Sequence, residues 1–155
     1  MDQQRVDLQW MHQAIELSKQ CPPSELFNVG SIVLSESRGL VATGYSRECE
    51  GGMHAEEIAL AKAKKAAASA KMGTLYSTLE PCHPRKSGKK SCTQHIIDAQ
   101  IKRVVYALKE QVFFVDCIGA ATLAAHGIEV VHLALLEDLV RQMNWHIFDA
   151  LPKGI

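Results

Sequence analysis

The sequence lacks the features that would assign it to a membrane, secreted or nucleic-acid-binding class. Its 17 basic residues balance its 17 acidic residues, so the formal net charge is zero. Extended contacts with nucleic acid or with membranes usually require an excess of positive charge. No apolar run approaches the roughly 20 residues that span a bilayer, and residues 1–5 are polar and form no signal-peptide core. We therefore expect a cytoplasmic protein that acts on a small molecule.

Disulfide bonds and a multidomain organisation are also not expected. Five cysteines are an odd number with irregular spacing, and in a chain without an export signal such cysteines usually ligate metal or stay buried as thiols. No internal repeat or low-complexity linker divides the 155 residues, of which 47% are hydrophobic. The sequence predicts one compact domain over residues 1–155.

Hydrophobic periodicity predicts alternating helices and strands. Helices are predicted over residues 6–20, 54–71, 92–99, 118–126 and 135–148, and strands over residues 28–34, 40–43, 74–78, 104–108 and 128–133. A hairpin turn is predicted at residues 35–39. From residue 74 onward strands and helices alternate, which requires crossover connections, so the last three strands should be parallel. The predicted fold is α/β, a mixed five-stranded sheet with helices on both faces.

Three side chains that can bind metal stand at the entrances of two predicted helices. His54 opens one helix, and Cys82 and Cys92 flank the loop before another. One imidazole and two thiolates leave the fourth tetrahedral position to water, which is the ligand count of a catalytic zinc site. A helix N-terminus also lowers the pKa of a thiol such as Cys92. The sequence predicts one Zn²⁺ per chain, and the alternative is a buried histidine with two core thiols.

Glu56 is the predicted general acid and base. It follows His54 by two positions, so it can reach the same cavity without joining the metal ligands, whereas Glu57 is expected to face elsewhere. Zinc allows its water to ionise near neutral pH, and a carboxylate can carry the released proton to a ring nitrogen and to a departing amine, typically for about 10²- to 10⁴-fold in rate. The predicted reaction is hydrolytic deamination.

Three short motifs and one loop resemble a known family. The motifs are Gly-Tyr-Ser-Arg-Glu at residues 44–48, His-Ala-Glu-Glu at residues 54–57 and Thr-Leu-Glu-Pro-Cys at residues 78–82, and the loop carries Cys82, Arg85, Ser87, Gly88 and Cys92. Together they resemble the deaminases of riboflavin biosynthesis, within the cytidine-deaminase superfamily, and the loop is similar to the fungal type. The gap of nine residues between the cysteines departs from the shorter gap of the common zinc-deaminase motif. The resemblance covers residues 6–132.

The resemblance implies a three-layer α-β-α cytidine-deaminase-like fold and a substrate that is a diaminopyrimidine with a ribosyl- or ribityl-phosphate side chain. It implies a homo-oligomer, a dimer, in which a neighbour shields the site. Arg85 can hold a phosphate through two hydrogen bonds, although the basic run of Arg85, Lys86, Lys89 and Lys90 also suits a solvated loop. The substrate contacts implied by the resemblance are Asn28, Ser46, Arg47, Arg85 and Ser87.

Other functions remain compatible with the same motif. One is deamination of a different nucleobase, nucleoside or nucleotide. Another is deamination of adenosine in tRNA, which requires contacts with flanking phosphates, but the zero net charge and the single lysine of residues 145–155 argue against it. A third is a non-catalytic module that keeps zinc for stability, and the intact Glu56 argues against it. No membrane or nucleic-acid partner is expected.

Overall fold

The structure is a computed structural model that describes residues 2–85, 87–109 and 118–149. The described residues form a five-stranded sheet with strand order β2-β1-β3-β4-β5. β1 pairs antiparallel with both β2 and β3, whereas β3, β4 and β5 run parallel. The mixed sheet and its parallel half are therefore confirmed. The strands are β1 (Gly30–Leu34), β2 (Leu40–Tyr45), β3 (Thr74–Leu79), β4 (Arg103–Leu108) and β5 (Glu129–His132).

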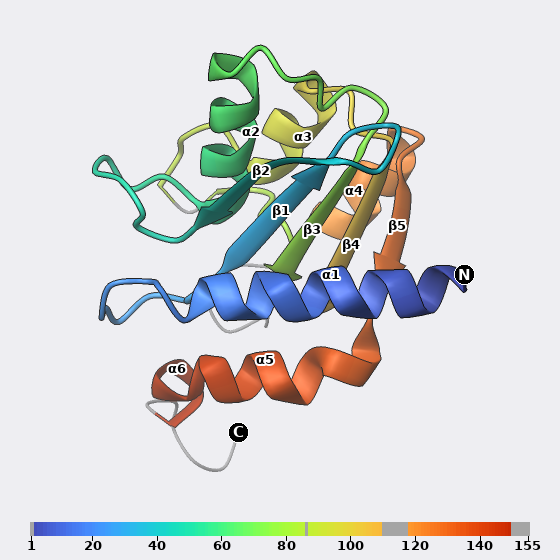
Figure 1. Cartoon of the computed structure of the whole chain (residues 1–155). Coiled ribbons are helices and arrows are strands. Elements are labelled where there is room, and N and C mark those ends of the chain that lie inside the picture. The colour runs from blue at the N-terminus through green and yellow to red at the C-terminus, as the bar shows by residue number, and fades with distance from the viewer. Residues whose placement is uncertain (1, 86, 110–117, 150–155) are drawn as a thin grey trace.

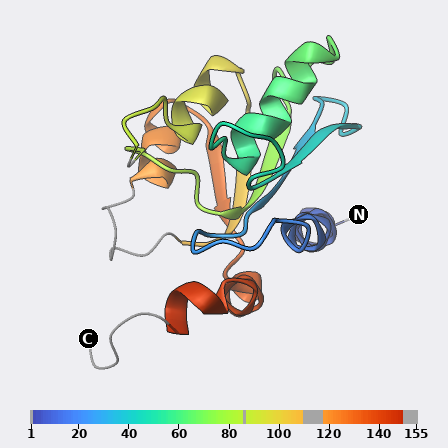
Figure 2. The same ribbon diagram turned by 90° about the vertical axis from the view of Figure 1, so that its left-hand side faces the viewer.

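Helices cover both faces of this sheet (Figure 1). The turned view shows three layers, with the sheet between two layers of helices (Figure 2). Within the described residues, no helix is both long enough and apolar enough to cross a membrane. One face carries α1 (Gln3–Ser18), the short 3₁₀ helix η1 (Ala134–Leu136), α5 (Glu137–Met143) and α6 (Trp145–Asp149), and the other carries α2 (Ala55–Lys65), α3 (Cys92–Asp98) and α4 (Gly119–Ala125).

Each face of the sheet has its own hydrophobic core because side chains alternate along the strands. Ile32 and Tyr76 belong to the core under α1 and α5, whereas Val33 and Leu75 belong to the core under α2, α3 and α4. All five residues of β1 are buried, which is expected of a strand covered on both sides. Burial of each large apolar side chain stabilises the fold by roughly 1.5–3 kcal/mol. The two cores together fix the strand ends on which the site is built.

A buried carboxylate joins α1 to the sheet. Asp7 is 2% exposed and accepts two hydrogen bonds from Arg103, at 2.7 and 2.6 Å, and one from the hydroxyl of Tyr76 at 2.8 Å. Burial alone would raise the pKa of Asp7, but the hydrogen bonds from Arg103, Tyr76 and Gln3 outweigh that effect and lower the pKa below its ordinary value. The charge of Asp7 is thus compensated inside the fold.

The prediction of a helix over residues 54–71 is wrong at its C-terminal end, because α2 ends at Lys65. Ala67 has a positive φ of 55°, and the N–H of Ala68 donates to the carbonyl of Ala63 at 3.0 Å. This hydrogen-bond pattern closes many helices, usually with glycine at the left-handed position. Since alanine stands there, the sequence contained no signal for the early end.

The prediction of one helix over residues 135–148 is also corrected, because η1, α5 and α6 are separate. The break lies at Asn144, which is fully buried. Its side-chain Oδ1 accepts from the backbone N–H of Asn28 at 2.7 Å, and its Nδ2 donates to the carbonyl of Val140 at 3.0 Å. Asparagine that bonds to backbone groups competes with the regular helix. Asn144 thereby ties the end of α5 to the segment before β1.

Substitution Asp7→Ala is expected to lower the free energy of unfolding by about 3–5 kcal/mol, because it leaves the charge of Arg103 without its main partner. Glu16→Ala is the control, since Glu16 also lies on α1 but forms an exposed ion pair with Lys19; it should cost at most about 1 kcal/mol. Urea unfolding of both variants measures the difference. Equal losses for the two variants would contradict the structural role of Asp7.

Candidate functional site

The three predicted metal ligands meet at the carboxyl end of β3, between the N-termini of α2 and α3. His54 is the N-cap residue of α2, Cys82 lies in the loop after β3, and Cys92 is the first residue of α3. Their ligand atoms all lie within 4.8 Å of one another. Among the described residues no other group of three such side chains gathers in this way. One nitrogen and two sulfurs are a donor set that suits zinc.

The two cysteines influence each other's ionisation. The backbone N–H of Cys92 donates to Sγ of Cys82 at 3.3 Å, and Nδ1 of His54 lies 3.3 Å from Sγ of Cys92. The pKa of Cys82 is lowered, chiefly because the Cys92 thiol donates to its sulfur, while the pKa of Cys92 is raised by this same bond to Cys82. A divalent cation would stabilise both thiolates at once. The site therefore has the chemistry of a zinc-binding cluster.

Glu56 lies beside this cluster in the first turn of α2. It is 4% exposed. Its Oε1 accepts a hydrogen bond from the hydroxyl of Ser77 at 2.7 Å, and its Oε2 lies 3.5 Å from Sγ of Cys92. Burial raises the pKa of Glu56 above its ordinary value. A carboxyl group whose pKa is raised toward neutrality is suited to both accept and donate a proton.

Glu57 connects the elements around the cluster and is a site residue that the sequence analysis missed. Its Oε1 accepts from the backbone N–H of His54 at 3.3 Å and from Nη1 of Arg85 at 3.1 Å. Its Oε2 lies 3.2 Å from Nε2 of His95 on α3. The available signal was its position three residues after the N-cap, where glutamate commonly bonds back to the N-cap N–H.

A protein-family comparison assigns the chain to a family. Residues 4–108 match the family described as the cytidine and deoxycytidylate deaminase zinc-binding region. The chain belongs to this deaminase family. The family description names zinc, and among the described residues His54, Cys82 and Cys92 form a group that could hold a metal ion.

Several similar proteins are named as proteins of riboflavin biosynthesis, such as RibD of Aquifex aeolicus. The chain is 37% identical to the diaminohydroxyphosphoribosylamino-pyrimidine deaminase of Schizosaccharomyces pombe, over 86% of this chain and 34% of that protein. It superimposes on Acinetobacter baumannii RibD with a TM-score of 0.83 and 31% identity, over 99% of this chain and 42% of the other. The Aspergillus oryzae Rib2 deaminase in complex with DARIPP shares the fold, with a TM-score of 0.70 and 24% identity, over 94% and 99% of the two chains.

The chain matches only part of the length of its curated relatives. The chain spans about a third of the length of the first curated relative, 34%, and 40% of the RibD protein of Aquifex aeolicus. Family membership and the three-layer fold of the deaminases apply to this chain directly.

Arg85 is the buried centre of the loop between the two cysteines of this deaminase-family chain. It is 7% exposed. Besides its ion pair with Glu57, its Nη2 donates to the carbonyl of Gly52 at 2.7 Å and its Nη1 to the carbonyl of Lys90 at 3.2 Å. The guanidinium thus holds the loop against residue 52 and α2. Ser87 is exposed on the same loop, and Lys86 lies outside the described residues.

The remaining predicted substrate contacts form a second group, around the segment before β1. Arg47 donates to the carbonyl of Pro22, at 2.8 Å from Nη2, and to the side-chain oxygen of Asn28. Ser46 is buried, and its hydroxyl accepts from the N–H of Val29 at 3.0 Å. These hydrogen bonds hold the segment of residues 22–29 to the end of β2. They do not connect these residues with the metal ligands.

The backbone that leads into Cys82 is supported by α4. Glu80 is 3% exposed, and its Oε2 accepts from the N–H of Ala120 at 3.0 Å. Gly119 lies so close to this backbone that a Cβ added there would stand 1.8 Å from the carbonyl oxygen of Pro81. Glycine is required by this close approach. Glu80 belongs to the motif at residues 78–82, but its sequence position did not reveal its partner on α4.

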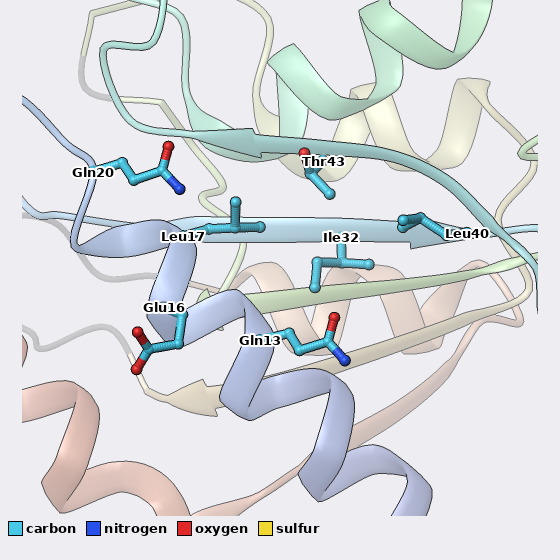
Figure 3. A pocket seen from close by; sticks show the side chains of 7 residues that line it. All are labelled: Gln13, Glu16, Leu17, Gln20, Ile32, Leu40 and Thr43. Carbon is cyan, nitrogen blue, oxygen red and sulfur yellow. The ribbon is translucent and has the colours of Figure 1, made fainter.

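A separate groove lies between α1 and β2 (Figure 3). Because Ile32 and Leu17 belong to the core of the α1 face, the groove is on the opposite side of the sheet from α2 and α3. It contains neither cysteine nor histidine, so it offers no comparable metal ligands. Its lining residues are Gln13, Glu16, Leu17, Gln20, Ile32, Leu40 and Thr43.

Purified protein is expected to hold one zinc ion per chain. Loss of an outer contact weakens metal binding by up to about 100-fold. Cys92→Ala removes a direct ligand and is therefore expected to weaken zinc binding by more than about 100-fold. Cys49→Ala is the control because Cys49 is an exposed free thiol, and it should retain the full zinc content. Metal analysis after dialysis against a chelator measures both variants. Undiminished zinc in Cys92→Ala would remove this residue from the ligand set.

Arg85→Ala is expected to lower the free energy of unfolding by about 1.5–3 kcal/mol, since it removes charge-assisted hydrogen bonds from a buried position. Lys89→Ala on the same loop is the control: Lys89 is exposed, and its side-chain Nζ donates to the carbonyl of Gly51 at 2.9 Å. Its effect should stay within about 0.5 kcal/mol. If Arg85→Ala keeps full stability and raises only KM, Arg85 serves the substrate instead of the loop.

Proposed function

We propose that the chain is a zinc-dependent hydrolase that removes an amino group from a small aminopyrimidine, the phosphorylated ribosyl- or ribityl-diaminopyrimidine intermediate of riboflavin biosynthesis. The observation that carries the proposal is the cluster of His54, Cys82 and Cys92 with the buried carboxyl group of Glu56 beside it. The substrate class is supported by the 37% identity with the Schizosaccharomyces pombe pyrimidine deaminase.

The metal ligands and the acid–base residue have separate roles in this proposal. His54, Cys82 and Cys92 would hold the ion, because they are the nitrogen and sulfur donors that zinc prefers. Zinc supplies, when bound, a Lewis acid that lowers the pKa of water to near neutrality. Three protein ligands agree with a catalytic rather than a structural site.

Glu56 would carry the protons of the reaction. Its carboxylate takes one proton from the attacking water and gives it to the ring nitrogen. It then takes the second proton from the newly added hydroxyl group and gives it to the departing amine, so that the carbonyl forms, the C–N bond breaks, ammonia leaves and the carboxylate is restored. Burial raises the pKa of Glu56. The free-energy difference between its ionised and protonated forms at neutral pH is therefore smaller, which favours both uptake and release of a proton. Because Glu56 is 4% exposed, bulk water has little access to the transferred proton.

The proposed substrate contacts differ in how readily they can bind. Ser87 is exposed and can donate to a phosphate without losing a protein partner on its donor side. Asn28, Arg47 and Arg85 already bond to protein groups, and so does Ser46. A substrate would bind these groups either by replacing those hydrogen bonds or through hydrogen-bond donors and acceptors that the protein contacts leave available. The homo-oligomer implied by the resemblance stays a prediction.

Zinc-loaded protein is expected to release ammonia from the phosphorylated ribosyl- or ribityl-diaminopyrimidine faster than from cytosine, cytidine or deoxycytidylate. Glu56→Gln should keep its zinc and lose at least about 10²-fold in kcat, because the amide cannot carry the proton. Glu50→Gln, at an exposed position, is the control and should keep full activity. Ammonia release and metal content are measured in parallel. The absence of ammonia from every pyrimidine would refute the proposed function.

A further inference from the structure

Ser77 stands on β3 at a position where the strand pattern favours an apolar side chain. It is 0% exposed, and Leu75, two residues earlier on the same strand face, belongs to the core under α2. A hydroxyl at such a position loses its hydrogen bonds to water, which destabilises the fold unless protein groups replace them. The partners of Ser77 therefore decide what this serine does.

The hydroxyl of Ser77 has two partners at the same short distance. It lies 2.7 Å from Oε1 of Glu56 and 2.7 Å from the carbonyl oxygen of Leu79. A hydroxyl has one hydrogen to donate and two lone pairs that accept. It can therefore donate to Oε1 of Glu56, with the carbonyl of Leu79 as its other acceptor within reach. Ser77 thus offers Glu56 a hydrogen-bond partner that is fixed on β3.

This bond also selects which oxygen of Glu56 faces the metal ligands. With Oε1 bonded to Ser77, Oε2 lies 3.5 Å from Sγ of Cys92. The terminal torsion of a glutamate side chain is broad and roughly two-fold, so the torsion itself does not fix the plane of the carboxyl group. A hydrogen bond from a strand that is buried on both faces does fix it.

We propose that Ser77 is a positioning residue of the reaction, whose hydroxyl holds the carboxyl group of Glu56 in the orientation needed for proton transfer. The inference rests on the proposed function, because it concerns the proton transfers of that reaction. Among the described contacts the Ser77 hydroxyl bonds to Glu56 and to the carbonyl of Leu79 and not to the candidate metal ligands, so it acts through Glu56.

Ser31 provides a matched control. It pairs directly with Ser77 across the antiparallel strands β1 and β3 and is also 0% exposed. Its hydroxyl donates to the backbone carbonyl of Tyr76 at 2.9 Å and makes no described bond to Glu56. Ser31→Ala therefore removes an equally buried hydroxyl from the same layer of the fold without changing the bonds of Glu56.

The test compares kcat, KM, zinc content and unfolding free energy of Ser77→Ala, Ser77→Thr and Ser31→Ala with those of the wild type. Ser77→Ala should lower kcat by about 10- to 100-fold, as misplacement of a catalytic group commonly does, with KM and zinc content unchanged. Ser77→Thr retains a hydroxyl that can hold the carboxyl group of Glu56 in place. Its kcat should therefore lie within about threefold of the wild-type value. Ser31→Ala should keep its kcat even where its stability falls.

The outcomes separate this inference from the proposed function. A wild type that releases no ammonia from any pyrimidine overturns the proposed function, and the role of Ser77 with it. An active wild type with an unchanged kcat in Ser77→Ala overturns the role of Ser77 alone, as does an equal fall of kcat in Ser31→Ala. If Ser77→Ala does not fold, Ser77→Thr and Ser77→Val decide, because they are similar in size and differ in the hydroxyl. Equal kcat values for that pair would overturn the inference.

Discussion

The convergence of two helix N-termini on the end of one strand is the constraint on which the site depends. His54, Cys82 and Cys92 come from three separate segments, yet their ligand atoms lie within 4.8 Å of one another. Such crowding of ionisable groups is unfavourable unless positive charge compensates it. The N-termini of α2 and α3 supply part of that compensation, since the N–H of Cys92 donates to Sγ of Cys82, and a divalent cation would supply the rest.

Outer contacts hold this arrangement in place. Glu57 bonds to the N-cap of α2 and to Arg85, and lies against His95 of α3. One carboxylate therefore fixes the relative positions of both helices and of the loop between the cysteines. Outer contacts of this kind orient the direct ligands of metal sites. The basic loop is for this reason part of the framework of the site, and its central arginine is not simply a solvated charge.

Much of the fold and the ligand set could be predicted from the sequence because both depend on local patterns. The parallel strands follow from alternating strands and helices, and the candidate ligands follow from His54, Cys82 and Cys92 at helix entrances. Features that depend on distant partners could not be predicted. Asn144 bonds to Asn28 across 116 residues, and Arg85 reaches Glu57 across 28.

The two errors in helix ends differ in origin. α2 ends early with Ala67 in a left-handed conformation, although alanine is the best helix former. The break at Asn144 depends on a buried amide whose partner belongs to another segment. Local propensity does not contain such information, since tertiary hydrogen bonds override it. The same holds for Glu57, whose neighbours on α3 and in the loop only the folded chain brings together.

The contact of Gly119 with Pro81 affects how natural variation in this chain should be interpreted. Any larger residue at position 119 would push against the backbone one residue before Cys82. A variant there would resemble a packing defect remote from the cluster of His54, Cys82 and Cys92, although its damage would reach Cys82, a candidate metal ligand, through the displaced main chain. Glycine at the start of α4 thus belongs to the framework of the candidate site, even though it contributes no side chain to it.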